Sequence, residues 1–104
     1  MSENQPNETL PVENQTGIQA KATIVNRRGL HARAAAKFVK LAGQFDAEIL
    51  VSNRGTEVSG SSIMGLMMLA AGPGCTIDLK ASGAQAEAAL QALVSLIEAK
   101  FDED

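Results

Sequence analysis

The sequence contains no tryptophan, no tyrosine and only three phenylalanine residues among its 104 residues. That scarcity argues against a surface that binds single-stranded nucleic acid by aromatic stacking. A single cysteine, Cys75, excludes an intramolecular disulfide framework, and a single histidine, His31, excludes a histidine-rich metal site. No apolar run approaches the roughly 20 residues of a membrane span, and no signal peptide is recognisable. We therefore expect a cytoplasmic protein with no membrane insertion.

The remaining composition is that of one globular domain with an acidic extension. Hydrophobic residues make up 45% of the chain and charged residues 20%, which is typical of a domain with its own core. Residues 1–17 are rich in Asn, Gln, Glu and Pro, and they contain three acidic residues and no basic one. We predict a disordered acidic tail over 1–17 and a domain over 18–104. The tail accounts for the whole net charge of −3.

A stretch without acidic side chains surrounds the histidine. Its basic residues are Lys21, Arg27, Arg28, Arg33, Lys37 and Lys40. A charge run is usually a solvated face, and the alternative here is an anion site or a surface for an acidic protein partner. The net negative charge and the lack of aromatics weigh against nucleic acid as the partner.

Hydrophobic periodicity predicts the element order β-α-β-β-α-β-α. Alternating patterns predict strands at 19–25, 47–52, 56–59 and 75–81. Spacings of three to four residues predict helices from 32 until Gly43, at 63–70 and at 84–101. Asn53-Arg54-Gly55 is typical of a hairpin turn between two of the strands. The fold class is therefore α+β, an open-faced β-sandwich whose four-stranded antiparallel sheet carries three helices on one face.

His31 lies between a glycine-containing turn and the predicted start of a helix. The first amide groups of a helix lack internal partners, and with the helix dipole they form an anion site. The same dipole disfavours the imidazolium, so we expect a neutral, nucleophilic imidazole. Arg33 could place a forked guanidinium on a phosphate, and no acidic residue lies nearby in the sequence to orient the ring. These residues favour transient phosphorylation of a histidine nitrogen; the alternative is a histidine that only caps the helix.

The segment Gly29-Leu30-His31-Ala32-Arg33-Ala34-Ala35 resembles the signature of the HPr family, the histidine-containing phosphocarriers of the bacterial phosphotransferase system. A second block, Ser62-Ile63-Met64-Gly65-Leu66-Met67, resembles the regulatory-serine segment of that family. The similarity runs from about Ile18 to Phe101, so it covers the predicted domain and leaves out the tail.

The resemblance implies a phosphoryl relay, in which the protein is a carrier and not an enzyme. His31 would accept the phosphoryl group from enzyme I on Nδ1 and pass it to an enzyme IIA, and Arg33 would stabilise the group during transfer. A monomer that needs no cofactor of its own is expected. Ala34 stands where the family usually has proline, so one more amide is free in the first turn of the helix.

Ser62 is predicted to cap the short helix that follows it. The resemblance implies a second role, because an ATP-dependent HPr kinase/phosphorylase modifies this position in many members of the family. A phosphate there would add about −1.5 to −2 charge and would block docking without refolding the domain.

The resemblance also implies one docking face for the partners, basic at the rim and apolar at the centre. The short helix is too short to bury both its faces, so we expect Met64 and Met67 to be partly exposed; packing in the core is the alternative. The predicted docking residues are Leu30, Arg28, Lys40, Ile63, Met64, Met67 and Met68.

Two questions stay open at this stage. A regulator that binds targets according to its phosphorylation state is the alternative to a relay protein. Segments 45–48 and 101–104 look like the nitrogen-related branch of the system, whereas the segment beginning at Ser62 looks like the kinase-regulated members. The sequence does not choose between the sugar-transporting and the nitrogen-related branch.

Overall fold

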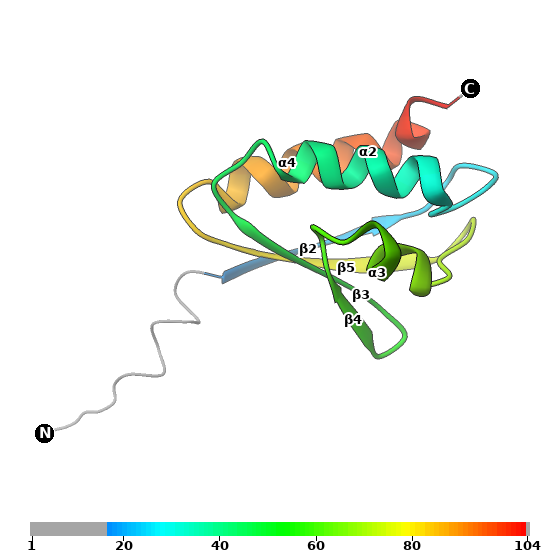
Figure 1. The fold of residues 1–104 in the computed structure, drawn as a ribbon, viewed down its shortest axis with the longest axis horizontal. Helices are drawn as coiled ribbons and strands as arrows, with labels where there is room; N and C mark the ends of the chain where they lie inside the picture. The colour runs from blue at the N-terminus through cyan, green and yellow to red at the C-terminus, as the bar shows by residue number, and fades with distance from the viewer. Residues whose placement is uncertain (1–16, 104) are drawn as a thin grey trace, which may run out of the picture.

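The computed structural model describes residues 17–103, which form a sheet covered by helices on one face (Figure 1). Its strands are β2 (Gly17–Thr23), β3 (Glu48–Asn53), β4 (Thr56–Ser59) and β5 (Thr76–Ser82). Its helices are α2 (Ala32–Ala42), α3 (Ile63–Met68) and α4 (Ala86–Glu98), followed by the 3₁₀-helix η1 (Lys100–Asp102). The predicted order and fold class are confirmed. Among these residues, no helix is long and apolar enough to cross a membrane.

The strand order in the sheet is β2-β5-β3-β4, and every neighbouring pair is antiparallel. The central strand β5 shows the alternation that its sequence predicts. Ile77 and Leu79 are fully buried beneath the helices, whereas Asp78 points to the opposite face. There Asp78 forms an ion pair with Lys21, with 2.5 Å between Nζ and Oδ1. One face of the sheet therefore builds the core, and the other carries charged pairs.

The hairpin between β3 and β4 forms where it was predicted, but with different residues in the turn. Arg54 and Gly55 take the positive φ values, 53° and 87°. Asn53 instead belongs to β3, and its buried amide donates to the carbonyl of Leu69 at 3.1 Å. The amide thereby ties the hairpin to the end of α3, which stops at Met68 and not at residue 70 as predicted.

The predicted last helix, 84–101, is divided in two. The α-helix ends at Glu98, and the next turn places Lys100, Phe101 and Asp102 at φ values of 60°, 55° and 62°. A right-handed helix cannot continue through such angles. Phe101 is nevertheless completely buried, because it continues the apolar stripe of Leu90, Leu93 and Ile97. The turn brings the C-terminal segment next to the start of α2 (Figure 1).

Smaller differences concern the ends of elements. β2 begins two residues earlier than predicted, and β5 is shifted by one residue towards the C-terminus. Cys75 therefore precedes β5, where it is partly buried against the core. Of the predicted tail, residues 1–16 lie outside the described part of the chain, and Gly17 is the first residue of β2.

Candidate functional site

The loop between β2 and α2 is held in place by backbone hydrogen bonds. Ile24 donates to Cys75 at 2.8 Å, and Leu30 donates to Ala71 at 3.0 Å. Between them, Gly29 has a φ of 64°, and a Cβ at this position would lie 2.4 Å from the carbonyl oxygen of Ala71. Only glycine fits this approach of two backbones without a shift. The position of the residues that follow thus depends on Gly29.

His31 is the N-cap residue of α2, with an extended backbone and no capping hydrogen bond from its side chain. Its carbonyl accepts the first helical hydrogen bond, from the amide of Ala35 at 2.8 Å. The amides of the first turn, from Ala32 to Ala34, therefore have no acceptor within the helix. They create the positive end of the helix dipole beside the imidazole, as the sequence predicted.

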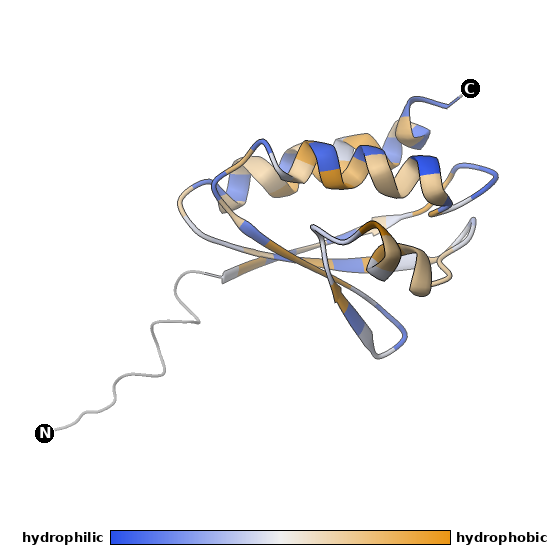
Figure 2. Ribbon diagram, viewed as in Figure 1, coloured by the Kyte–Doolittle hydropathy of each residue, from blue (hydrophilic) through white to orange (hydrophobic). Residues whose placement is uncertain are grey.

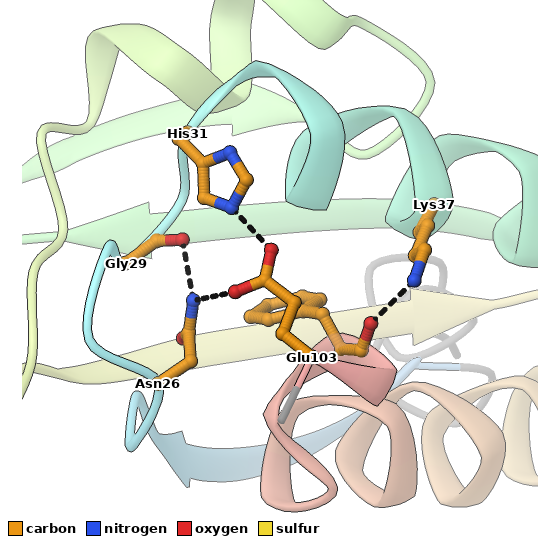
Figure 3. Close-up of polar contacts among 6 residues, drawn as sticks. Asn26, Gly29, His31, Lys37 and Glu103 are labelled. Atoms are coloured by element: carbon orange, nitrogen blue, oxygen red, sulfur yellow. Dashed lines mark hydrogen bonds and ion pairs between the residues drawn. The ribbon is translucent and has the colours of Figure 1, made fainter.

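The Nε2 atom of His31 forms a hydrogen bond with Oε2 of Glu103 (Figure 3). Both side chains are mostly buried, with exposed fractions of 15% and 18%. Because an ionised carboxylate can only accept, Nε2 is the nitrogen that carries the proton. In the neutral imidazole, Nδ1 then keeps its lone pair, and Figure 3 shows it on the side of the ring away from Glu103.

Asn26 fixes the other oxygen of the same carboxylate. Its Nδ2 donates to Oε1 of Glu103 at 3.2 Å and to the carbonyl of Gly29 at 2.9 Å. Both partners are acceptors, so the orientation of the amide is unambiguous. Asn26 is 1% exposed, and its Oδ1 has no partner within residues 17–103. One buried amide thus connects the loop before His31 to the C-terminal segment.

The C-terminal segment is anchored two residues before Glu103, at Phe101. The Phe101 side chain lies in the core, and its carbonyl accepts a hydrogen bond from Nζ of Lys37 at 2.7 Å. Lys37 belongs to α2, so the helix that begins at His31 also holds the segment that carries Glu103. The Nζ of Lys37 is therefore bound to the C-terminal segment.

The pKa of Glu103 lies below its ordinary value of 4.5. Partial burial raises this pKa, but hydrogen bonds from His31 and Asn26 lower it, and so do the charges of His31 and Arg28. The lowering prevails, so Glu103 is a carboxylate at neutral pH and a hydrogen-bond acceptor for His31.

The basic residues that are close together in the sequence around His31 lie on different elements and faces of the structure. Arg28, Arg33 and Lys40 are exposed, with Arg33 on the first turn of α2 and Lys40 on its last. Lys40 follows His31 by nine residues, which corresponds to about 13 Å along a helix. Lys21 lies on the uncovered face of the sheet, paired with Asp78. Arg28, in the loop before α2, and Arg33, on its first turn, thus lie closer to His31 in the chain than Lys40 does.

The apolar helix α3 is exposed on one side. Met64 and Met68 are 74% and 75% exposed, and Ile63 and Met67 are partly exposed. Leu66 is the residue of α3 that is buried. Figure 2 shows no strongly hydrophilic residue along this helix, which packs against α2. Leu30, by contrast, is 6% exposed, so its side chain belongs to the core and not to the predicted docking face.

Ser62 caps α3 as predicted. Its Oγ accepts a hydrogen bond from the amide of Gly65 at 2.9 Å. The hydroxyl is partly buried, and its oxygen satisfies one of the free amides at the start of α3.

Sequence reasoning missed Glu103 and Asn26. It found no acidic residue near His31, because Glu103 lies 72 positions further along the chain. The acidic residues at the end of the sequence were recognised, but the sequence does not show that they lie next to His31. Among residues 17–103, no group of three or more potential ligands could hold a metal ion.

Comparisons with known proteins identify the family to which the chain belongs. A family model described as the PTS HPr component phosphorylation site matches residues 18–99. The chain is 48% identical over 88 residues to phosphocarrier protein NPr of Shewanella violacea, covering 85% of this chain and 97% of that protein. It is 46% identical over 86 residues to phosphocarrier protein HPr of Cupriavidus necator, covering 83% of this chain and 97% of that protein.

A solved structure extends the similarity to three dimensions. The crystal structure of HPr-C-His from Thermoanaerobacter tengcongensis has a TM-score of 0.80 and 42% sequence identity, with 84% of this chain and 98% of that chain covered. The class defined by fold and sequence is that of the phosphocarrier proteins of the phosphotransferase system. Within this class, the chain belongs to the HPr family.

Proposed function

We propose that this protein accepts a phosphoryl group on Nδ1 of His31 from phosphorylated enzyme I and passes it to an enzyme IIA. The observation that carries this proposal is the position of Nδ1, which is free of the Glu103 contact at the start of α2. Membership of the HPr family supports a role in phosphoryl transfer. The carrier would act as a monomer in the cytoplasm and needs no cofactor for this step.

The chemistry of the step requires little beyond positioning and charge. The lone pair of Nδ1 attacks phosphorus, and the bond from phosphorus to the donor breaks with its electron pair on the donor. The amides of the first helical turn and the exposed side chain of Arg33 would stabilise the charge that develops on the phosphoryl oxygens. Transfer to the acceptor runs through the same geometry in reverse.

The direct test is labelling with phosphoenolpyruvate and enzyme I. The wild-type protein is expected to take up one acid-labile phosphoryl group, and His31→Ala is expected to take up none. Acid treatment distinguishes the products, because phosphohistidine is lost in acid and phosphoserine survives. Continued labelling of the His31→Ala variant would show that the assignment of the acceptor is wrong.

We further propose that partners dock on the exposed side of α3 together with the start of α2, and that phosphorylation of Ser62 interferes with this docking. Met64 and Met68 offer flexible apolar side chains that suit several partners. A phosphate on Ser62 would introduce a double negative charge beside this apolar surface without disturbing the helix end. Purified HPr kinase and ATP should then give an acid-stable label that is absent from Ser62→Ala.

A regulator that binds target proteins remains the second candidate function. Its support is the exposed apolar helix α3, which offers a surface for a target protein. A target of such a regulator should bind His31→Ala as well as the wild type but should lose affinity for Ser62→Asp. A target that responds to phosphorylation of His31 alone would contradict this candidate and favour the relay.

A further inference from the structure

We propose that Glu103 is a positioning residue for phosphoryl transfer, which keeps the proton on Nε2 of His31 so that Nδ1 remains the reacting nitrogen. The inference rests on the proposed function of His31 and adds a residue to it. Glu103 does not touch the phosphoryl group. It acts through the imidazole, from the opposite side of the ring.

The carboxylate of Glu103 is held in one position by its surroundings. Its Oε1 accepts from the buried amide of Asn26, and its Oε2 accepts from His31. Two residues before it, Phe101 is buried in the core, and the Phe101 carbonyl is bound by Lys37. A carboxylate held at both oxygens and anchored through the backbone offers the imidazole one defined acceptor. Surface carboxylates that form exposed ion pairs lack this support.

The contact with Glu103 also selects one of the two tautomers of the His31 imidazole. A neutral imidazole carries its proton on either nitrogen, and only the unprotonated nitrogen can attack phosphorus. A carboxylate that accepts from Nε2 selects the tautomer in which Nδ1 is free, and it also fixes the rotation of the ring. Within residues 17–103, the sequence around His31 supplies no other acid that could do this.

Glu103 also balances the charge that the His31 ring acquires during phosphoryl transfer. When Nδ1 bonds to phosphorus, the ring keeps its proton on Nε2 and becomes positively charged. The carboxylate of Glu103 compensates for that charge. In the reverse step, the bond from phosphorus to Nδ1 breaks, its electron pair returns to Nδ1, and a neutral imidazole leaves. If Nε2 lost its proton, the leaving group would be an imidazolate anion, which departs far less readily. No proton has to move in either direction while Glu103 holds it.

The charged groups around this pair are few. Arg28 adds positive charge near Glu103, and Lys37 is bound to the Phe101 carbonyl. Asp102 is exposed on the same segment and points to no described partner in the site. It offers a matched control, because Asp102→Ala removes the same charge from the same segment without removing the contact with His31.

The first experiment observes the contact itself, in the full-length, unphosphorylated protein. Nitrogen-15 NMR of the imidazole is expected to show His31 with its proton on Nε2, and this proton should exchange slowly enough with water to be visible. Glu103→Ala should lose the visible proton. Glu103→Gln should retain it, because the amide oxygen can still accept, and so should Asp102→Ala. A proton on Nδ1 in the wild type, or equal exchange in the wild type and Glu103→Ala, would overturn the proposal.

The second experiment measures transfer. Phosphorylation by enzyme I should become slower by about tenfold in Glu103→Ala at saturating carrier concentration, as is typical when an orienting partner is removed, with little change in KM. Glu103→Gln should recover part of the rate, because it restores the orientation of the ring but not the negative charge. Wild-type rates in Glu103→Ala, or a loss that appears only in KM, would contradict a positioning role.

The two proposals fail in different ways. If His31→Ala is still labelled, the proposed function falls, whatever NMR shows about Glu103. If His31 is labelled as expected but its Nε2 proton is insensitive to Glu103, only the positioning role falls.

Discussion

The side chains of His31 and Glu103 are joined by a hydrogen bond across 72 positions of the sequence. The contact connects the start of the second element of the fold to the last segment that the structure describes. It assigns different roles to the two ring nitrogens, since Nε2 is a donor to a carboxylate and Nδ1 is left free. The contact therefore joins the site at the start of α2 to the C-terminal segment.

The lowered pKa of Glu103 predicts how stability depends on pH. A carboxyl group whose folded-state pKa lies below 4.5 stabilises the fold above that pH, and the contribution is lost as the pH falls through the lowered value. Glu103→Gln lacks this contribution at every pH. Urea unfolding should therefore show the wild type more stable than Glu103→Gln at neutral pH, with the difference shrinking as the pH falls below 4.5. A difference that grows on acidification would contradict the sign of the shift.

Gly29 is predicted to be irreplaceable in the loop before His31. Gly29→Ala combines a positive φ with a Cβ only 2.4 Å from the Ala71 oxygen, so the two backbones must separate. We expect a loss of more than about 2 kcal/mol in the free energy of unfolding, because strain in the loop adds to the cost of about 1 kcal/mol for a left-handed alanine.

Gly55→Ala is the matched control for Gly29→Ala. Gly55 also has a positive φ, 87°, but a Cβ there would meet nothing within 4 Å. The Gly55→Ala variant should lose about 1 kcal/mol in the free energy of unfolding and should leave phosphorylation of His31 unchanged. Equal losses in both variants would show that the close approach to Ala71 does not matter.

Phe101 is predicted to anchor both the core and the site. Phe101→Ala removes a fully buried ring and should cost about 3–5 kcal/mol in the free energy of unfolding. Because the segment that carries Glu103 is then released, the Nε2 proton of His31 should also exchange faster. Phe101→Leu keeps an apolar anchor and should retain the slow exchange, with a smaller loss of stability. Unfolding by urea and the NMR signal of the imidazole measure the two effects separately.

Met68 is predicted to matter for partners and not for folding. It is 75% exposed, so Met68→Ala should leave the free energy of unfolding within about 0.5 kcal/mol of the wild type. If enzyme I docks on α3, its affinity should fall by roughly 5- to 30-fold, the range for loss of 1–2 kcal/mol at an interface. Ile18→Ala, on the edge strand β2, is the control and should leave affinity unchanged. Calorimetric titration of both variants tests the location of the docking surface.

Some predictions from sequence failed for a local physical reason. The last helix was expected to continue to Phe101 because the apolar stripe continues to that residue. The apolar pattern correctly predicts that Phe101 is buried, but it carries no information about the backbone angle φ. Phe101 reaches the core from a turn with three positive φ values. Likewise, Leu30 was assigned to the docking face from its place in the motif, although its side chain packs into the core.

The sequence by itself determined the layered α+β fold, the burial of alternate residues in the strands, and the placement of His31 at the start of a helix. These follow from hydrophobic periodicity, glycine positions and capping, which are properties of neighbouring residues. Only the tertiary structure decided that Glu103 and Asn26 meet at His31, that Lys37 binds the C-terminal segment, and that Lys21 pairs with Asp78 on the far face of the sheet. These contacts join residues distant in the chain, and their distances are set by how the helices pack on the sheet and how the chain turns after α4.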